Sequence, residues 1–416
     1  MKRQLEKYYN KRALTSPWQL AGTSRNNFQA AIIIPALAES QSLPQTIASL
    51  ATNPDEYLQQ TLIVIVINNR QSASSENKAD NRLTIEWLQN DPYPQLNIAW
   101  VDAASDGLEL PEKEGVGLAR KIGFDLSLPL LDWAAQPLLI SLDADTLVDA
   151  NYLPAISQHF ETTRCGGATI PFRHQSTDTP EQDAAIRCYE LYLRSYLFGL
   201  KQAGSPYAYH TVGSAFACLA GSYVAAGGMN RRHAAEDFYF IQQLAKTCGV
   251  EMLQGTVVHP SARFSDRVPF GTGKAVQGQV KDRQQLFQFS SAKGFIILRQ
   301  WLELVCENLD EPAEVLLEQA SRLSPRLHTF LAELNFAATW ERLQKNYGTP
   351  QKRLTAFHGW FDGLRTRQML SRVESDPDAS FETKVAELLK WGGRARISHW
   401  PEQLQLLEQL QGVDIS

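Results

Sequence analysis

The sequence predicts an α/β protein in which a mostly parallel sheet, flanked by helices, is followed by an all-helical C-terminal segment. Between about residues 30 and 258, apolar runs of strand length alternate with helical patterns, and this alternation is typical of βαβ units. From about residue 280 the strand-like runs stop, and Leu, Glu, Gln, Arg and Ala recur at helical spacing. Two different architectures are therefore expected in one chain.

The α/β part is expected to begin after a lead-in at residues 1–27, which are polar and aromatic and predict a short helix. The predicted strands are 30–35, 61–68, 96–101, 138–142, 168–172, 215–220 and 250–258. The helices between the first four strands are predicted near 43–51, 83–89 and 117–126. A longer helix is predicted from Pro180 to about Lys201, because Thr179 can cap it and Gln182 can complete a capping box.

The predicted elements divide the chain into a lead-in at 1–27, an α/β domain at 28–279 and a helical segment at 280–416. Breaks in the helical segment are expected near Ser324-Pro325, near Gly348 and near Gly392-Gly393. Its helical patterns are too apolar to stand free in water. We therefore expect this segment to pack on the α/β domain.

Composition excludes several classes of protein. The hydrophobic share of 44% and the charged share of 20% are those of a soluble globular protein. The net charge of −5 gives no bulk attraction to nucleic acid or to an anionic membrane. The five cysteines are scattered without a Cys-x-x-Cys pair, which favours neither a zinc site nor a disulfide framework and favours a cytoplasmic location. The charged first residues, which lack an apolar core, are not expected to form a signal peptide, and no apolar run approaches about 20 residues.

The most informative motif is a pair of carboxylates at the end of the strand expected at 138–142. Asp143 and Asp145 are separated by one small residue, so a turn after the strand can bring both to one place. Mg²⁺ and Mn²⁺ take oxygen ligands, often one or two carboxylates together with substrate phosphates. The carboxyl ends of strands are where open α/β sheets bind ligands. A polar loop that merely caps the strand is the alternative interpretation.

Further motifs follow in a fixed order along the chain. They are Ile34-Pro35 with Leu37 and Glu39, the spaced Gly115, Gly117 and Arg120, the pair Gly227-Gly228, the acids Glu236-Asp237 at a helix start, and His259 after a strand-like run. Together with Asp143-Ala144-Asp145, this order resembles the family 2 glycosyltransferases and related enzymes of the GT-A fold. The resemblance covers roughly residues 28–275.

This resemblance implies a GT-A catalytic domain that transfers a sugar from a nucleotide-diphosphate sugar to a hydroxyl group. The acceptor can be a sugar, a lipid-linked molecule or a small molecule, so peripheral membrane contact stays open. The resemblance implies Mn²⁺ or Mg²⁺ as cofactor, with Asp145 as a direct ligand and Asp143 reaching the ribose or the metal through water. It also implies that His259 completes the metal shell; a hydrogen-bonded structural histidine is the alternative.

The resemblance also assigns the acids and the nucleotide contacts. Asp237 matches the general base that takes the acceptor proton, which suggests inversion, and Glu236 is then expected to orient the acceptor; a plain helix cap is the alternative. The remaining nucleotide or donor contacts are expected from Pro35, Leu37, Glu39, Asn68, Gly115 and Arg120. Asn68 departs from the aspartate usual at the end of the second strand, so the nucleotide is not specified.

The cations after His259 give one more expectation. Arg263 and Lys274 lie in a Gly-bearing stretch that could close over a diphosphate, although a solvated linker explains the same residues. Two other functions compete with the glycosyltransferase hypothesis. One is a sugar-phosphate nucleotidyltransferase, and the other is a catalytically inactive GT-A domain that serves as a binding scaffold.

Overall fold

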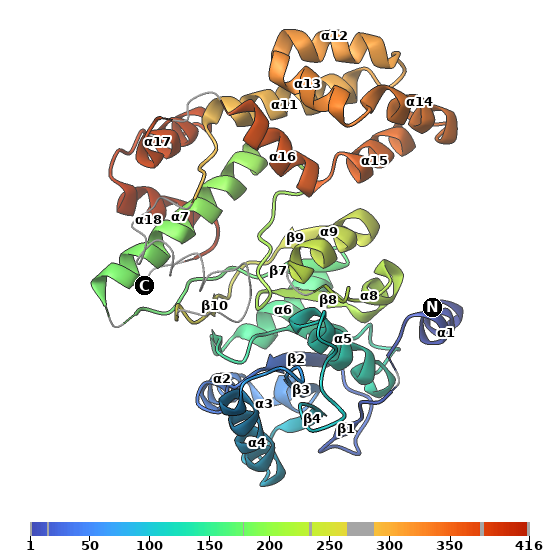
Figure 1. Cartoon of the computed structure of the whole chain (residues 1–416), viewed down its shortest axis with the longest axis vertical. Coiled ribbons are helices and arrows are strands. Elements are labelled where there is room, and N and C mark those ends of the chain that lie inside the picture. Colours follow the sequence, from blue (N-terminus) through green and yellow to red (C-terminus); the bar gives the residue numbers. More distant parts are fainter. Residues whose placement is uncertain are drawn as a thin grey trace. The chain divides into compact units, whose positions relative to one another are not determined.

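A computed structural model describes residues 2–14, 16–177, 179–232, 235–263, 287–374 and 378–413 (Figure 1). The chain divides into two compact units. The α/β unit comprises Met1–Ile186, Tyr209–Asp282 and Gly412–Asp414, and the helical unit comprises Arg187–Ala208, Arg283–Gln411 and Ile415–Ser416. Each unit is described by itself below.

The α/β unit alternates strands and helices along most of its length. Its strands are β1 (Leu20–Ala21), β2 (Ala30–Ala36), β3 (Thr61–Asn68), β4 (Asn97–Ala103), β5 (Leu138–Ser141), β6 (Leu147–Val148), β7 (Gly167–Thr169), β8 (Phe216–Leu219), β9 (Val250–Met252) and β10 (Val258–His259). Its helices are α1 (Lys2–Lys11), α2 (Leu43–Leu50), α3 (Asp55–Leu58), α4 (Ser75–Gln89), α5 (Val116–Ser127), α6 (Tyr152–Thr162), α8 (Ala220–Ala226) and α9 (Glu236–Cys248). A short 3₁₀ turn, Leu128–Leu130, follows α5.

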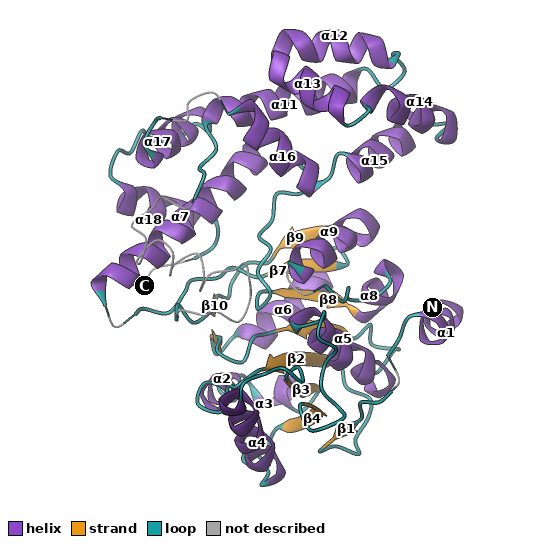
Figure 2. Ribbon diagram, viewed as in Figure 1, coloured by secondary structure: helices purple, strands orange, loops and turns teal. Residues whose placement is uncertain are grey.

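Among the described residues, eight strands form one sheet in the order β1-β4-β3-β2-β5-β8-β7-β9, drawn in orange in Figure 2. The central strands β4, β3, β2 and β5 are parallel, while β8 runs antiparallel to both of its neighbours. A second, two-stranded sheet pairs β10 with β6. Parallel neighbours place their carboxyl ends at one edge of the sheet, and the predicted site motifs follow these ends.

The central strands are buried on both faces, which explains their nearly continuous apolar sequence. All residues of β2 and β3 are buried. On one face α5 packs closely, because Gly123 has no side chain and lies against Ile33 and Val66. On the other face Ile140, the register partner of Ile32, lines a cavity together with α6.

Pro35 marks the point where β5 leaves the sheet. The β2–β5 pairing ends at Ile33 with Ser141, two residues before Pro35, while β2 remains paired with β3 as far as Ala36. Proline has no backbone N–H to donate, so it is tolerated where a neighbouring strand has already diverged. The chain after β5, which carries Asp143 and Asp145, is thereby released from the sheet.

The helical unit consists of the greater part of α7 (Pro180–Gln202) and of α11 (Ala292–Glu307), α12 (Ala313–Leu323), α13 (Pro325–Glu333), α14 (Phe336–Asn346), α15 (Pro350–Trp360), α16 (Gly363–Val373), α17 (Phe381–Trp391) and α18 (Trp400–Leu410). Several of its helix starts are capped by side-chain oxygens, for example those of Ser291, Ser324 and Thr349. Trp301 is fully buried, and its ring packs edge-on against those of Phe336 and Phe357.

The predicted fold class is confirmed: a mostly parallel sheet flanked by helices is accompanied by an all-helical C-terminal part. Two predicted elements are corrected. The strand expected at 250–258 is two short strands in different sheets, because the chain between them turns at Gly255, whose φ is +90°. Helix α4 begins at Ser75, well before residue 83, because Ser74 caps it through the backbone N–H of Asn77.

The expected boundary near residue 280 falls outside the described residues and stays a prediction, as does the packing of the helical segment on the α/β domain. Residues 187–208, which we expected in the α/β domain, cluster with the helical unit. None of the described helices is both long and apolar enough to cross a bilayer.

Candidate active site

The candidate site lies at the carboxyl ends of β2, β3 and β5. The loop after β2 carries Leu37 and Glu39, β3 ends at Asn68, and the chain after β5 carries Asp143 and Asp145. Two buried or half-buried arginines connect these segments to the rest of the unit. Arg120 comes from α5, and Arg263 follows β10.

Arg120 joins two of the predicted acids, and we call this group the Arg120 cluster. Its guanidinium pairs with Asp143, at 2.5 Å from Nη2 to Oδ1, and with Glu236, while Nε donates to the Ser141 hydroxyl at 3.0 Å. Gly213 lies close to the guanidinium, where a Cβ would lie 2.4 Å from Nη2. Arg120 is 2% exposed, so its guanidinium interacts with the surrounding side chains and has almost no contact with solvent.

Glu236 and Asp237, which we call the acid pair, both have raised pKa values. Burial raises the pKa of Glu236 to about 7, which outweighs the opposing effect of Arg120, and the neighbouring charge of Asp237 raises it further. Burial also raises the pKa of Asp237, again against the effect of Arg120. Raised carboxyl pKa values bring both groups closer to the range in which they can exchange protons near neutral pH.

The loop before the acid pair is fixed against the first turn of α5. At Gly117 a Cβ would lie 2.5 Å from the Arg232 carbonyl oxygen and 2.9 Å from the Glu236 Cβ, so only glycine permits this approach. The Asn230 side-chain amide donates to the backbone carbonyl of Glu236 at 2.7 Å. Gly117 therefore serves close packing of this loop, while Gly115 is the buried residue that precedes α5.

Arg263 forms the second group, which we call the Arg263 cluster. Its Nη2 pairs with Asp145 Oδ2 at 2.8 Å and with the carboxylate of Glu39, and its Nη1 lies 3.3 Å from the Ser42 hydroxyl. The structure thus brings the loop after β2 to the second aspartate of the Asp143-Ala144-Asp145 motif. Lys274, which we expected to act with Arg263, lies outside the described residues.

His259 has partners other than the two aspartates of the motif. Its Nε2 lies 3.0 Å from Asp149 Oδ1, and its Nδ1 lies 3.2 Å from the Arg173 carbonyl oxygen. Asp149 in turn accepts from the backbone N–H of Val257 at 3.0 Å. The ring therefore connects β10 to the turn after β6. These contacts favour the structural interpretation of His259, and its metal role stays a prediction that the observed hydrogen bonds do not favour.

The residues that we expected to contact the nucleotide lie at or near the ends of β2 and β3. Leu37 is half-buried, while Pro35 and Asn68 are buried. The Asn68 amide nitrogen donates to the backbone carbonyls of Ala36 and Val66, both at 3.1 Å, and so ties the ends of β2 and β3 together. Both amide hydrogens are used, which leaves the carbonyl oxygen of the side chain for an N–H group of a ligand.

The carboxylates fit one kind of metal site. Among the described residues, no three His, Cys, Asp or Glu side chains form a group that could hold a metal by themselves. Asp143 and Asp145 nevertheless offer hard oxygen ligands, with side chains 35% and 22% exposed. A divalent cation held by one or two carboxylates together with substrate phosphates fits this donor set.

No protein-family model and no curated protein matches the chain. Among solved structures, the chain is similar to TarS 1-349 of S. aureus, at 9% identity and a TM-score of 0.38, over 92% of this chain and 85% of TarS. It is also similar to the mannosyltransferase PcManGT of Pyrobaculum calidifontis in complex with GDP-Man and Mn2+, at 15% identity and a TM-score of 0.37, over 89% and 91% of the two chains. The structure of TarS 1-349 with UDP-GlcNAc matches at 11% identity and a TM-score of 0.37, over 92% and 91%. These likenesses are remote, and we base the functional proposal on the site residues.

Sequence reasoning missed three parts of the site. Ser141 is the last residue of β5 and accepts a hydrogen bond from Arg120, and Gly213 leaves the space that the guanidinium occupies. The pairing of Arg263 with Asp145 was also missed. A single glycine or serine carries no signal of its own, and the partners of Arg263 lie more than a hundred residues away in the sequence.

Proposed function

We propose that this protein is a metal-dependent glycosyltransferase of the GT-A type that transfers a sugar from a nucleotide-diphosphate sugar to a hydroxyl acceptor. The observation that carries the proposal is the Arg120 cluster, in which one buried arginine pairs with Asp143 at the carboxyl end of β5 and with Glu236 of the acid pair. This arrangement supports the proposal, because Asp143, a carboxylate that could help to hold a cation, lies beside acids that could exchange a proton with an acceptor hydroxyl.

The donor is expected to bind at the strand ends. Leu37, Glu39 and Asn68 would contact the base and ribose, and Asp143 and Asp145 would hold Mn²⁺ or Mg²⁺ with the diphosphate oxygens. When bound, the cation stabilises the negative charge that the diphosphate gains as the sugar leaves. Arg263 pairs with Asp145 and Glu39, and with a cation held at Asp145 its guanidinium would be available to pair with the diphosphate.

The acceptor is expected on the side of the acid pair. Asp237 is half-buried and would take the proton of the attacking hydroxyl, a role that its raised pKa favours. Glu236 is buried and ion-paired, so it would orient Arg120 and the loop while Asp237 exchanges the proton. A base that acts directly on the acceptor suggests inversion at the sugar.

Product analysis with a panel of UDP- and GDP-sugars, each with Mn²⁺ and with simple sugar acceptors, tests this proposal. We expect release of nucleoside diphosphate that depends on Mn²⁺ or Mg²⁺. Release of pyrophosphate from nucleoside triphosphate and sugar phosphate would instead indicate a nucleotidyltransferase. Metal-dependent nucleotide binding without any turnover, by hydrolysis or transfer, would indicate the inactive scaffold.

A further inference from the structure

A second polar cluster lies buried beside the Arg120 cluster, and Asp125 of α5 is its centre. Asp125 Oδ1 accepts from the hydroxyls of Tyr8, at 2.6 Å, and Tyr223, at 2.8 Å. Its Oδ2 pairs with Lys121 at 2.8 Å and accepts from the backbone N–H of Leu14 at 2.9 Å. Lys121 also donates to the Tyr8 hydroxyl at 3.0 Å. We call these residues the Asp125 cluster.

Burying the Asp125 cluster costs desolvation free energy, because it contains the ion pair of Lys121 and Asp125. Stability alone is therefore a weak reason for this cluster, and we consider a second role. Tyr8, Lys121 and Asp125 are 3%, 5% and 2% exposed. Removing an ion pair from water costs free energy that only well-placed hydrogen bonds recover. Apolar residues of similar size in its place often give a protein that is equally stable or more stable. Burial raises the pKa of Tyr8, so its hydroxyl remains a hydrogen-bond donor to Asp125.

The cluster contacts the start of the loop that leads to the acid pair. At Gly228, where φ is +78°, a Cβ would lie 2.0 Å from the Tyr8 hydroxyl, so the helix α1 packs directly on this backbone. The Gly228 N–H donates to the Tyr223 carbonyl at 2.9 Å. The Tyr223 hydroxyl, which donates to Asp125 at 2.8 Å, also interacts with the backbone of Met229.

The same loop reaches the Arg120 cluster at its other end. The side chain of Met229 is buried, and the Asn230 amide donates to the Glu236 carbonyl. Glu236 then pairs with Arg120, the residue directly before Lys121 on α5. Consecutive residues of one helix therefore anchor the two ends of this loop, Lys121 through the Asp125 cluster and Arg120 through Glu236.

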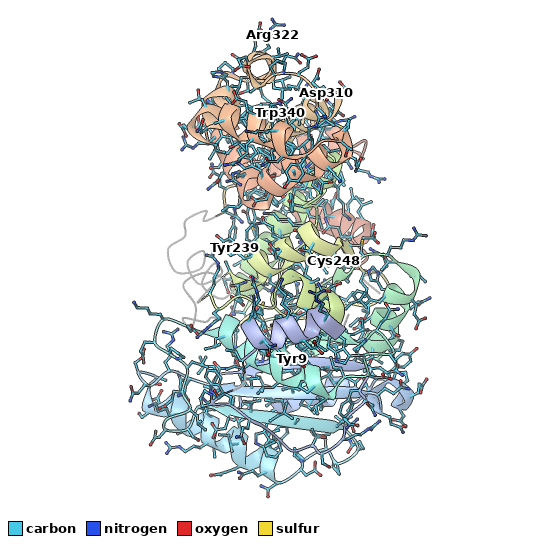
Figure 3. All side chains as sticks on the ribbon, turned by 90° about the vertical axis from the view of Figure 1, so that its right-hand side faces the viewer. Tyr9, Tyr239, Cys248, Asp310, Arg322 and Trp340 are labelled. Carbon is cyan, nitrogen blue, oxygen red and sulfur yellow. The ribbon has the colours of Figure 1, made fainter. Side chains whose placement is uncertain are left out.

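We propose that Tyr8 is a positioning residue for the acid pair: its hydroxyl, through the Asp125 cluster, fixes the described residues 228–232, and through Asn230 also Glu236, in the position that transfer requires. This inference rests on the proposed function for its kinetic consequence, but its structural consequence can be measured without any substrate. Figure 3 labels Tyr9, the neighbour of Tyr8 on α1, and Tyr239 on α9, the helix that opens with the acid pair.

The first test is hydrogen–deuterium exchange of the full chain without ligand. Tyr8→Phe and Tyr223→Phe each remove one hydroxyl from the Asp125 cluster and keep the ring. We expect both variants to speed amide exchange several-fold in peptides covering Gly228 to Asp237. Tyr9→Phe is the matched control, because Tyr9 is half-buried on the same helix and lies outside the hydrogen bonds of Asp125 described above. It should leave exchange in this loop unchanged.

The second test is kinetic and uses the donor sugar that gives the highest turnover in the panel described above. We expect Tyr8→Phe to lower kcat roughly 10- to 100-fold, with the donor KM within about twofold, because a small misplacement of a catalytic group is costly. Tyr9→Phe should keep the wild-type kcat. A purely structural role would lower the melting temperature and leave kcat of the folded enzyme unchanged.

The two tests separate the two ideas. If the wild-type protein turns over no donor, the proposed function fails, while the exchange experiment still decides whether Tyr8 fixes the loop. If the wild-type protein is active and Tyr8→Phe matches it in loop exchange and in kcat, the positioning role is overturned and the glycosyltransferase proposal stands. Exchange that rises equally in Tyr8→Phe and Tyr9→Phe would also overturn it, because the effect would then belong to the helix as a whole.

Discussion

Gly117 and Glu236 lie in direct contact: a Cβ at Gly117 would lie 2.9 Å from the Cβ of Glu236. This approach places the start of α5, which carries Arg120, against the start of α9, which carries the acid pair. The glycine is therefore required by packing between two parts of the site. It also makes the site sensitive to a single added methyl group.

Gly117→Ala should displace the loop before the acid pair, because the new Cβ would also lie 2.5 Å from the Arg232 carbonyl oxygen. We expect the free energy of unfolding to fall by about 1–3 kcal/mol, as overpacking usually costs, and turnover to fall as well. Urea denaturation and a donor turnover assay measure both effects. Gly359→Ala, on α15 with no atom within 4 Å of the new Cβ, is the control and should stabilise by up to about 1 kcal/mol. Equal effects from the two substitutions would contradict the packing role of Gly117.

The stability of the protein should fall as pH rises through the range in which Glu236 titrates. Its pKa is raised from 4.5 to about 7 in the folded protein, so the unfolded chain loses this proton first. The free energy of unfolding should therefore decrease from about pH 4.5 to about pH 7, by on the order of 3 kcal/mol from this group, and not change further above that range. Glu236→Gln should lack this decrease. Urea denaturation of both proteins across this range measures it, and parallel pH profiles would contradict the assignment.

Asp237→Asn keeps the shape of the side chain and removes its basicity. We expect near-normal donor binding and a loss of transfer of roughly 10²-fold or more, the range that removal of a general base produces. Asp55→Asn, an exposed acid in the first turn of α3, makes the same chemical change at a helix start outside the site and should leave transfer unchanged. If Asp237→Asn transfers at the wild-type rate, Asp237 is only a helix cap.

His259→Ala tests whether the hydrogen bonds seen in the structure decide the role of His259. Loss of the contacts to Asp149 and to the Arg173 carbonyl should lower stability by about 1 kcal/mol. We expect the Mn²⁺ dependence of nucleotide binding to be unchanged, and Asp149→Ala to show the same behaviour. A tenfold or greater rise in the Mn²⁺ concentration required, with unchanged stability, would place His259 in the metal shell, as the family resemblance implies.

The parts of the fold that the sequence predicted well are those with a strong local pattern. β3 was predicted with the bounds it has, Thr61–Asn68, because it is buried throughout and therefore apolar throughout. The strand expected at 250–258 was wrong because the apolar residues on both sides of Gly255 form one strand-like pattern in the sequence, although the chain turns at this glycine. The start of α4 was missed because its first two turns are polar and only Ser74, the cap, marks their beginning.

The site was predictable as a set of residues and not as a set of contacts. Asp143, Arg120 and Glu236 each follow a strand end or a helix start, and the structure brings all three together. The pairing of Arg263 with Asp145, and that of Tyr8 with Asp125, join segments more than a hundred residues apart. Spacing within one sequence cannot reveal such contacts, because they depend on how the elements pack.

The central claim is that Asp145 helps to hold a divalent cation together with a nucleoside diphosphate. Isothermal titration of UDP and GDP into wild-type and Asp145→Ala protein, with and without Mn²⁺, tests this claim most directly. We predict that wild-type protein binds at least one of them only when Mn²⁺ is present, and that Asp145→Ala loses this binding while its circular dichroism spectrum stays unchanged. Nucleotide binding by Asp145→Ala with the wild-type affinity and the wild-type dependence on Mn²⁺ would contradict the account.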